Sequence, residues 1–463
     1  MLRRPQSAST DIERIGDAQY ALLPRLFPQF DFVRALKLTG LVAAGVLLLG
    51  FSCVGLLYLT RGTPVSSVRT FGQAPPPAVM DPLFRRTVDL HAGMTMERGN
   101  NVEVLFNGNQ TYPRLWADLR SARQTITLQM YYANPGKVAD TLKSILIDRA
   151  RAGVRVLFLQ DAIGSQNLTD EWQDSLRAAG VQVAIFRPPR WYQLDKAGHR
   201  SHIRVVVVDG HIGYTGGFGI DDKWLGDGRK NESWRDTNVR FTGPAVMQLQ
   251  ATFAAGWAEA TGELVTGQLF FPLEEFAHDG DDFGALLHMA PTVGSTPAER
   301  FLALSIEGAR TTMYIANSYF VPDDDFRRML VAAAQRGVDV RILTASDKTD
   351  IKTTWYAGRK RYEELLEGGV RVYEYAPTMM HAKTFVIDGV WSTVGTMNFD
   401  NRSLAFNDES NLVTFDQRVG AVMDSVFLED LTHSTEIKLA TFRRRPWYQK
   451  VFETGASLLS RVL

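Results

Sequence analysis

An internal duplication constrains the fold of this 463-residue chain more than any other feature of its sequence. Residues 151–156 (RAGVRV) resemble residues 335–340 (QRGVDV), and residues 178–183 (AAGVQV) resemble residues 367–372 (EGGVRV). The separation of about 185 residues is far longer than the period of a solenoid repeat. It indicates two homologous domains, each large enough to bury its own core.

Both domains repeat one order of amphipathic helices and apolar strands. In the first domain, the periodicity predicts helices at 115–123, 138–152 and 169–179 and strands at 125–132, 154–160, 181–186 and 203–209. In the second domain, it predicts helices at 298–309, 326–335 and 359–366 and strands at 312–319, 338–344, 370–375 and 383–388. Strands that alternate with helices indicate an α/β fold with mixed sheets flanked by helices.

The last predicted strand of each domain carries the same chemically distinctive pattern. His381 is followed two residues later by a lysine and then by Asp388, and His202 is followed at the same spacing by Arg204 and Asp209. Because side chains alternate along a strand, the histidine and the cation two residues later share one face. A nucleophile or proton carrier beside a fixed cation suits phosphoryl chemistry.

An apolar run near the amino terminus predicts a membrane anchor. Residues 38–59 contain no charge, and Lys37 and Arg61 bound the run. As a helix the run would span about 33 Å, which is enough to cross the hydrocarbon core of a bilayer. A cleaved signal peptide is disfavoured because the run is long, begins late and has no clear cleavage site.

The charges that flank this run predict its orientation. Lysine and arginine are more frequent before the run than directly after it, so the positive-inside rule places the amino terminus in the cytoplasm and the large domains outside. The predicted organisation is a cytoplasmic segment (1–37), a transmembrane helix (38–59), a linker (60–94) and two domains (95–275 and 276–463).

The composition argues against a nucleic-acid partner and against sites built from several cysteines. The 51 Lys and Arg residues balance the 51 Asp and Glu residues, so the net charge does not favour a polyanion, and no nucleic-acid partner is expected. Cys53 is the only cysteine and lies within the apolar run. An intramolecular disulfide and a cysteine-based zinc site are therefore excluded.

The paired histidine patterns resemble the HxK(x)4D motifs of the phospholipase D superfamily, and more narrowly those of bacterial cardiolipin synthases. Further stretches that resemble this family lie at 214–226, 234–237, 318–323, 362–373 and 395–403. One such motif would be a weak signal, whereas two at matching places in a duplicated unit are a strong one. The resemblance covers most of the chain after the linker. It implies two phospholipase D-like domains related by a pseudo-twofold, with both motifs at one central site.

The resemblance also implies a two-step phosphodiester exchange that needs neither a metal nor another cofactor. His202 is expected to attack phosphorus and form a phosphohistidine, and His381 is expected to act as general acid and base. Two cations and an amide are expected to hold the phosphate oxygens as charge develops: Arg204, Lys383 and Asn398. Asp236 and Glu409 lie downstream of their motifs, where they are expected to hydrogen-bond His202 and His381, respectively.

Other motif positions are expected to support the site. Asp209 and Asp388 complete the two motifs and are expected to support their structure rather than to perform chemistry. The expected substrate-binding residues lie in the segments that follow the motifs: Gly216, Gly217, Gly395 and Thr396. The two adjacent glycines fit a tight turn with positive φ, a close approach to phosphate, or both.

The first motif departs from the family pattern. Arg204 replaces the motif lysine, and Gly219 stands at the position that matches Asn398 by its spacing from the histidine. Arginine keeps the positive charge, but its planar guanidinium is wider than an ammonium group. Activity of this half-site could survive, slow down or be lost.

The leading expectation is a membrane-anchored phosphatidyltransferase that makes cardiolipin from two phosphatidylglycerol molecules and releases glycerol. One alternative is a phospholipase D-type hydrolase or phosphodiesterase. Another is a catalytically impaired, lipid-binding homologue, which Arg204 motivates. The expected partners are phospholipids and the membrane. The expected location is the bacterial inner membrane, with a single span and an extracytoplasmic catalytic part, and the sequence does not predict the oligomeric state.

Overall fold

The computed structural model describes residues 32–60, 65–71, 74–189, 199–230, 233–272, 279–291 and 295–460. The chain divides into two compact units, residues 1–61 and 62–463. In the first unit, helix α2 (Phe32–Thr60) contains the predicted apolar run. Its segment Leu36–Cys53 is long and apolar enough to cross a membrane. Most of the cations used to predict the orientation lie outside the described residues.

The strands of the second unit form one sheet of 15 strands within the described residues. Those of the first half are β1 (Glu97–Phe106), β2 (Thr125–Met130), β3 (Arg155–Asp161), β4 (Gln182–Phe186), β5 (Val205–Val208), β6 (Ile212–Gly216) and β7 (Thr237–Thr242). Those of the second half are β8 (Asp282–Met289), β9 (Thr312–Asn317), β10 (Asp339–Ala345), β11 (Arg371–Tyr375), β12 (Lys383–Ile387), β13 (Trp391–Gly395), β14 (Glu409–Phe415) and β15 (Ser434–Ile437).

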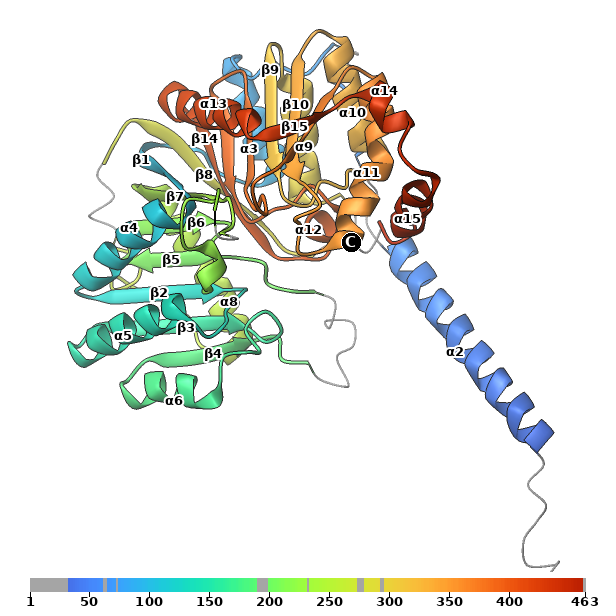
Figure 1. Ribbon diagram of the computed structural model, residues 1–463. Coiled ribbons are helices and arrows are strands. Elements are labelled where there is room, and N and C mark those ends of the chain that lie inside the picture. Colours follow the sequence, from blue (N-terminus) through green and yellow to red (C-terminus); the bar gives the residue numbers. More distant parts are fainter. Residues whose placement is uncertain are drawn as a thin grey trace, which may run out of the picture. The chain divides into compact units, whose positions relative to one another are not determined.

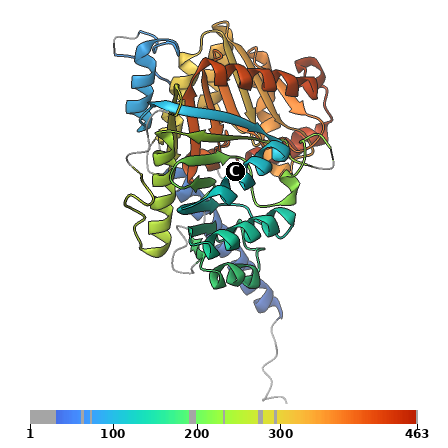
Figure 2. The same cartoon turned by 90° about the vertical axis from the view of Figure 1, so that its left-hand side faces the viewer.

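The order of these strands is duplicated. The first half reads β4-β3-β2-β5-β6-β7-β1, and the second half reads β11-β10-β9-β12-β13-β14-β8, with β15 added at the edge. Strands β2, β3 and β4 pair in parallel, as do β9, β10 and β11, whereas β5 and β12 join their neighbours antiparallel. The predicted mixed α/β fold is therefore confirmed. The halves join where β1 pairs with β8, and they form adjoining blocks in Figures 1 and 2.

Helices cover both faces of each half-sheet because strand side chains alternate. The first half carries α4 (Asn107–Ser121), α5 (Lys137–Arg151), α6 (Asp170–Ala178) and α8 (Ala245–Thr261). The second carries α9 (Pro297–Gly308), α10 (Asp324–Gln335), α11 (Lys352–Glu367) and α13 (Gln417–Thr432). On β9, Ile315 belongs to the apolar cluster that contains α9 and α10, whereas Tyr314 stacks on Phe427 of α13. Buried layers therefore hold the central strands from both sides.

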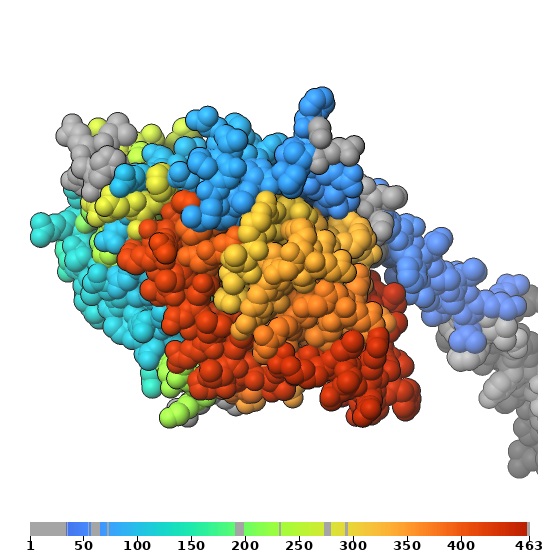
Figure 3. Space-filling model, turned by 90° about the horizontal axis from the view of Figure 1, so that it is seen from above, coloured from blue at the N-terminus to red at the C-terminus, as the bar shows by residue number. Residues whose placement is uncertain are grey.

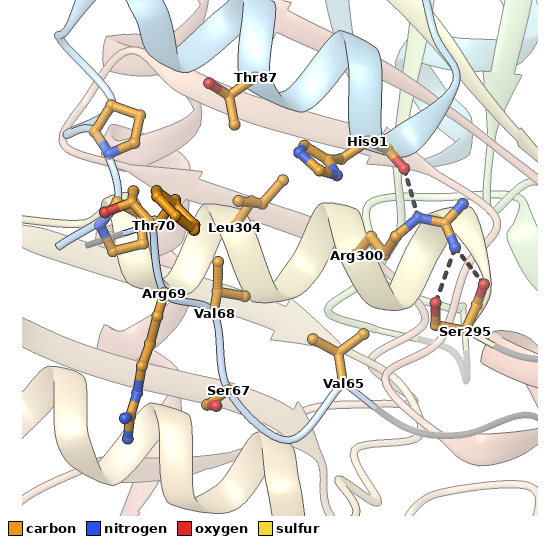
Figure 4. Close-up of a pocket in the computed structure, with 13 residues that line it drawn as sticks. Val65, Ser67, Val68, Arg69, Thr70, Thr87, His91, Ser295, Arg300 and Leu304 are labelled. Carbon is orange, nitrogen blue, oxygen red and sulfur yellow. Dashed lines mark hydrogen bonds between the residues drawn. The ribbon is translucent and has the colours of Figure 1, made fainter. Parts of the chain in front are cut away.

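Part of the predicted linker belongs to the core of the second half. Helix α3 (Pro82–Ala92) begins after the cap Asp81 and packs Phe84 edge-on against Trp391, with ring centroids 5.1 Å apart. In Figure 3, this blue segment lies over the yellow and orange second half. Residues of the segments 65–71 and 76–77, α3 and α9, together with Ser295, line a cavity of about 570 Å³ whose lining includes neither motif histidine (Figure 4).

The helices and strands that the periodicity predicts are all present. Most of their ends lie within two residues of the prediction, but α4 and α11 begin eight and seven residues earlier than expected. The α4 helix begins earlier than predicted, at Asn107, whose φ of 58° marks the sharp entry from β1. The sequence reasoning did not identify β1 or β8. These two strands connect the half-sheets, so the way in which the domains join was not predicted.

Candidate active site

The two motif histidines line one cavity in the second unit. His202 lies just before β5 and His381 just before β12, and the cavity that they share has a volume of about 380 Å³. Both side chains are almost fully buried. The fold therefore brings together the motifs that the sequence separates.

Main-chain hydrogen bonds hold each motif against the opposite half. The N–H of His202 donates to the carbonyl of Asp408 over 3.0 Å, and the N–H of His381 donates to the carbonyl of Arg235 over 2.7 Å. Each acceptor immediately precedes a buried acidic residue in the sequence. The backbone thus places a carboxyl group from one half beside the histidine of the other.

The histidine–carboxyl pairs are crossed between the halves. Nδ1 of His202 lies 2.9 Å from Oε2 of Glu409, and Nδ1 of His381 lies 2.8 Å from Oδ2 of Asp236. The prediction that Asp236 serves His202 and Glu409 serves His381 is wrong. Each carboxyl group stands at the start of β7 or β14, where the chain pairs with the opposite motif rather than with its own.

A buried cation accompanies each histidine. Nζ of Lys383 donates to the carbonyl of His381 over 2.7 Å and to Oγ of Ser318 over 2.6 Å, and it lies 3.0 Å from Nε2 of His381. Nη1 of Arg204 donates to the carbonyl of His202 over 3.0 Å. The arginine therefore repeats the contact of the lysine with the motif histidine carbonyl. Its Nε is buried and has no hydrogen-bond partner among the described residues.

Burial and neighbouring cations keep both imidazoles neutral. Burial, followed by the charge of Lys383, lowers the pKa of His381 to about 3. Burial and the charge of Arg204 hold the pKa of His202 well below its usual value. Burial also lowers the pKa of Lys383 to about 7. Each neutral ring has one nitrogen that carries a proton and one that carries a lone pair.

The two carboxyl groups differ in their ionisation. Burial raises the pKa of Asp236, but His381, Lys383 and the indole N–H of Trp224 outweigh it, so the pKa lies below its usual value. Burial raises the pKa of Glu409 to about 7. At neutral pH the partner of His381 is therefore ionised, whereas the partner of His202 exchanges between its two forms.

Gly219 has no side chain to match that of Asn398, and the indole of Trp224 occupies the space beside it. Asn398 lines the cavity and accepts from Oγ of Ser318. A Cβ added at Gly219, the matching position, would lie 2.8 Å from the ring of Trp224. This indole donates to Asp236 over 2.8 Å and packs edge-on against the ring of His381. An aromatic side chain thus takes the place of the amide.

Asp209 and Asp388 lie away from the cavity, at the other ends of β5 and β12. Oδ1 of Asp388 accepts from the N–H groups of Thr311 and Thr312, and Oδ1 of Asp209 accepts from the N–H of Thr125. Both aspartates adopt left-handed backbone conformations, with φ of 54° and 53°. Their contacts tie the motif strand to the start of its neighbour, which supports a structural role.

None of the four expected substrate-binding residues lines the cavity. A Cβ at Gly217 would lie 2.2 Å from Oδ1 of Asp236, and one at Gly395 would lie 2.4 Å from the Asn411 side chain. Gly216 has a φ of 146°. Oγ1 of Thr396 exchanges hydrogen bonds with the backbone of Ser410. The glycines make room for the carboxyl-bearing strands, whereas Thr396 hydrogen-bonds Glu409 through its side chain and His202 through its backbone.

Several cavity residues were not singled out from the sequence. They come from both halves and include Tyr131, Trp224, Trp234, Tyr319 and Arg402. Most of them fall within the family-like stretches 214–226, 234–237, 318–323 and 395–403, which was the available signal. Their individual roles depend on tertiary contacts that spacing does not give.

The chain is similar to known proteins in sequence and in fold. The family model described as "Cardiolipin synthase, PLD-like domain" matches residues 115–257 and 302–431. A cardiolipin synthase of Geobacillus kaustophilus is 35% identical over 363 residues, covering 78% of this chain and 72% of that relative. Cardiolipin synthase 2 of Bacillus anthracis is 34% identical over 384 residues, covering 82% and 74%.

Among solved structures, phosphatidylserine synthase of Haemophilus influenzae superposes with a TM-score of 0.62 at 12% identity, covering 82% of this chain and all of that one. At this identity the likeness concerns the fold alone. The family match includes both histidine motifs and both crossed carboxyl groups. The chain therefore belongs to the cardiolipin synthase family of phospholipase D-like proteins.

Proposed function

We propose that the protein is a phosphatidyltransferase that makes cardiolipin from two phosphatidylglycerol molecules and releases glycerol. The observation that carries this proposal is the single cavity in which a buried histidine from each half stands beside its own cation. The cardiolipin synthase relatives, at about a third identity over most of the chain, support the same substrate class.

In the proposed first step, Nε2 of His202 attacks the phosphorus of the donor lipid. Glu409 fixes Nδ1, so the other ring nitrogen is available for attack when it carries the lone pair. The phosphorus–nitrogen bond forms as the bond to the glycerol oxygen breaks, and this oxygen takes a proton from Nε2 of His381. Arg204 and Lys383 stabilise the negative charge that develops on the phosphate oxygens.

In the second step, His381 takes a proton from a glycerol hydroxyl of the second phosphatidylglycerol. The resulting oxygen attacks the phosphohistidine, a new phosphodiester forms, and His202 is released. Asp236 supports the protonated state of His381 because its carboxylate accepts from Nδ1. A bound phosphodiester adds negative charge, which offsets the charge of Lys383 and raises the pKa of His381 toward the range needed for an acid.

The same geometry serves a hydrolase if water replaces the second lipid. A catalytically impaired lipid-binding protein is the other alternative, because Arg204 departs from the motif. Against impairment, Arg204 makes the same contact with the motif carbonyl that Lys383 makes. The aromatic lining of the cavity, with Tyr131, Trp234 and Tyr319, favours an alcohol on a lipid over bulk water as acceptor.

Product analysis tests the reaction. We expect the purified full-length protein to convert labelled phosphatidylglycerol into cardiolipin and glycerol, which chromatography would resolve. The His381→Ala variant should form neither product, because it lacks the proton donor. Phosphatidic acid as the sole lipid product would instead identify a hydrolase, and lipid binding without any turnover would identify the impaired homologue.

The raised pKa of Glu409 predicts an acid limb in the pH profile. Below a pH of about 7, Glu409 is protonated and donates to Nδ1 of His202, which leaves the proton on Nε2 and prevents attack. We expect kcat/KM to fall tenfold per pH unit below this value. Glu409→Gln should lower the rate at pH 8 by roughly 10–100-fold and remove this limb.

Asp408→Asn provides the matched control, since this neighbouring carboxyl group pairs with Arg187 rather than with a histidine side chain. It should keep the limb near pH 7. An unchanged limb in the Glu409→Gln variant would assign the ionisation to another group.

The substitution in the first motif gives a further prediction. Arg204→Lys restores the motif residue, and lysine can make the same contact with the carbonyl of the motif histidine. We therefore expect kcat/KM at or above the wild-type value, whereas Arg204→Gln should lower it roughly 100-fold by removing a buried charge. Complete loss of activity in the lysine variant would mean that the site depends on the guanidinium.

We also propose that α2 anchors the chain in the bacterial inner membrane as a single span, with the second unit outside the cytoplasm. The apolar segment Leu36–Cys53 supports an anchor, and the cations that precede it in the sequence support the orientation. A reporter that works only outside the cytoplasm should be active when it is fused at the carboxyl terminus. Activity of a reporter that works only in the cytoplasm would indicate the opposite orientation.

A further inference from the structure

The carboxyl-terminal helix α15 (Trp447–Ser457) exposes large apolar side chains on one side. Trp447 is 76% exposed, Val451 and Phe452 are each 58% exposed, and Leu458, just beyond the helix, is 81% exposed. Tyr448 and Leu459 extend the same surface. At 100° per residue, all six fall within one stripe along the helix axis. We call these six residues the apolar stripe.

The opposite side of α15 is fixed to the protein by polar contacts. Glu453 is fully buried, and its carboxylate accepts from Nη2 of Arg445 over 2.7 Å and lies 3.5 Å from Nε of Arg359 on α11. Oγ of Ser460 accepts from Arg361, also on α11. The helix is therefore held by the side that carries Glu453, with its large apolar side chains outward, whereas an ordinary surface helix turns its apolar side inward. In Figure 1, α15 lies outside α11.

This helix is connected to the wall of the active-site cavity. The carbonyl of Ser460 accepts from Nδ2 of Asn401 over 2.7 Å, at the start of α12 (Asn401–Ala405), which also carries the cavity residues Arg402 and Ser403. Helix α11, which contacts α15, also reaches the cavity, because Thr354 in its first turn lines it. The apolar stripe and the cavity are thus presented by the same group of packed helices.

We propose that the apolar stripe inserts into the surface of a bilayer that contains anionic phospholipid, and that it thereby brings the cavity to its lipid substrate. Trp and Tyr at the beginning of the stripe are the side chains that prefer the bilayer interface. Arg444 and Lys450 are exposed beside it, which suits lipid phosphates. The assignment of the substrate, though not of the surface itself, rests on the proposed function.

Spin labels test the position of the stripe without any need for activity. Cys53 is the only cysteine, so Cys53→Ser leaves a background in which Phe452→Cys or Val451→Cys carries a single label. The full-length variants are placed in vesicles of phosphatidylglycerol and phosphatidylcholine. We expect each label to be reached by oxygen, which concentrates in the bilayer, and to be shielded severalfold from a water-soluble nickel chelate.

The matched control is Ser175→Cys. Ser175 is also exposed on a helix, α6, but lies outside the apolar stripe. Its label should be reached by the nickel chelate. The proposal is overturned if the label at 452 is as accessible to nickel as the label at 175. It is also overturned if the label at 452 shows spin–spin broadening, which would mean that a second copy of the chain covers the stripe.

Activity provides a second readout. The double substitution Val451→Glu and Phe452→Glu changes exposed residues only, so turnover of detergent-dispersed phosphatidylglycerol should match the wild type. On phosphatidylglycerol vesicles, we expect about tenfold lower turnover, because the charges prevent apolar burial in the interface. Equal activity in vesicles would overturn the proposal. Absence of turnover in the wild type would contradict the proposed function, and the spin-label result would still decide the membrane contact.

Discussion

The crossed histidine–carboxyl pairs are the interaction on which the rest of the structure depends. His202 is held by Glu409, and His381 is held by Asp236, so neither half contains a complete site. The main-chain hydrogen bonds that the two histidines donate to the carbonyls of Asp408 and Arg235 set these pairs in register. A buried imidazole needs such a partner to fix its tautomer, and here only the opposite half can supply it. The joined sheet therefore serves catalysis as well as stability.

The local elements could be predicted because they depend on residues close in sequence. Alternation of side chains identifies the strands that precede and carry each motif, and the echoes around Gly153 and Gly337 reveal the duplication. The crossing could not be predicted in this way. Asp236 is nearer in sequence to His202 than to His381, but Arg235, the residue before it, pairs with Met380 and the backbone of His381. Spacing alone favours the wrong partner.

Arg204 and Gly219 also show what sequence comparison alone cannot predict. Comparison of the repeats identifies Arg204 and Gly219 as departures but does not say what replaces the missing groups. In the structure, Arg204 contacts the same carbonyl position as Lys383, and Trp224 fills the space beside Gly219. The indole comes from η2 (Asp222–Trp224), between β6 and β7, at the place where the second half carries α12 between β13 and β14. By its spacing from the motif histidine, Trp224 matches Ser403. Comparison of the repeats identifies the changed positions, whereas the side chains that surround them are seen only in the structure.

The same asymmetry gives the two histidines different chemistry. Asp236 receives hydrogen bonds from both His381 and Trp224 and stays ionised, which favours proton uptake by His381. Glu409 lacks such an indole among the described residues, and burial raises its pKa to about 7. A histidine beside a carboxylate that is ionised at neutral pH suits a proton carrier, whereas one beside a carboxyl group that ionises near neutrality suits a nucleophile that pH can switch off. In the proposed mechanism, the duplicated fold provides two equivalent rings, and the residues that differ between the halves give them separate roles.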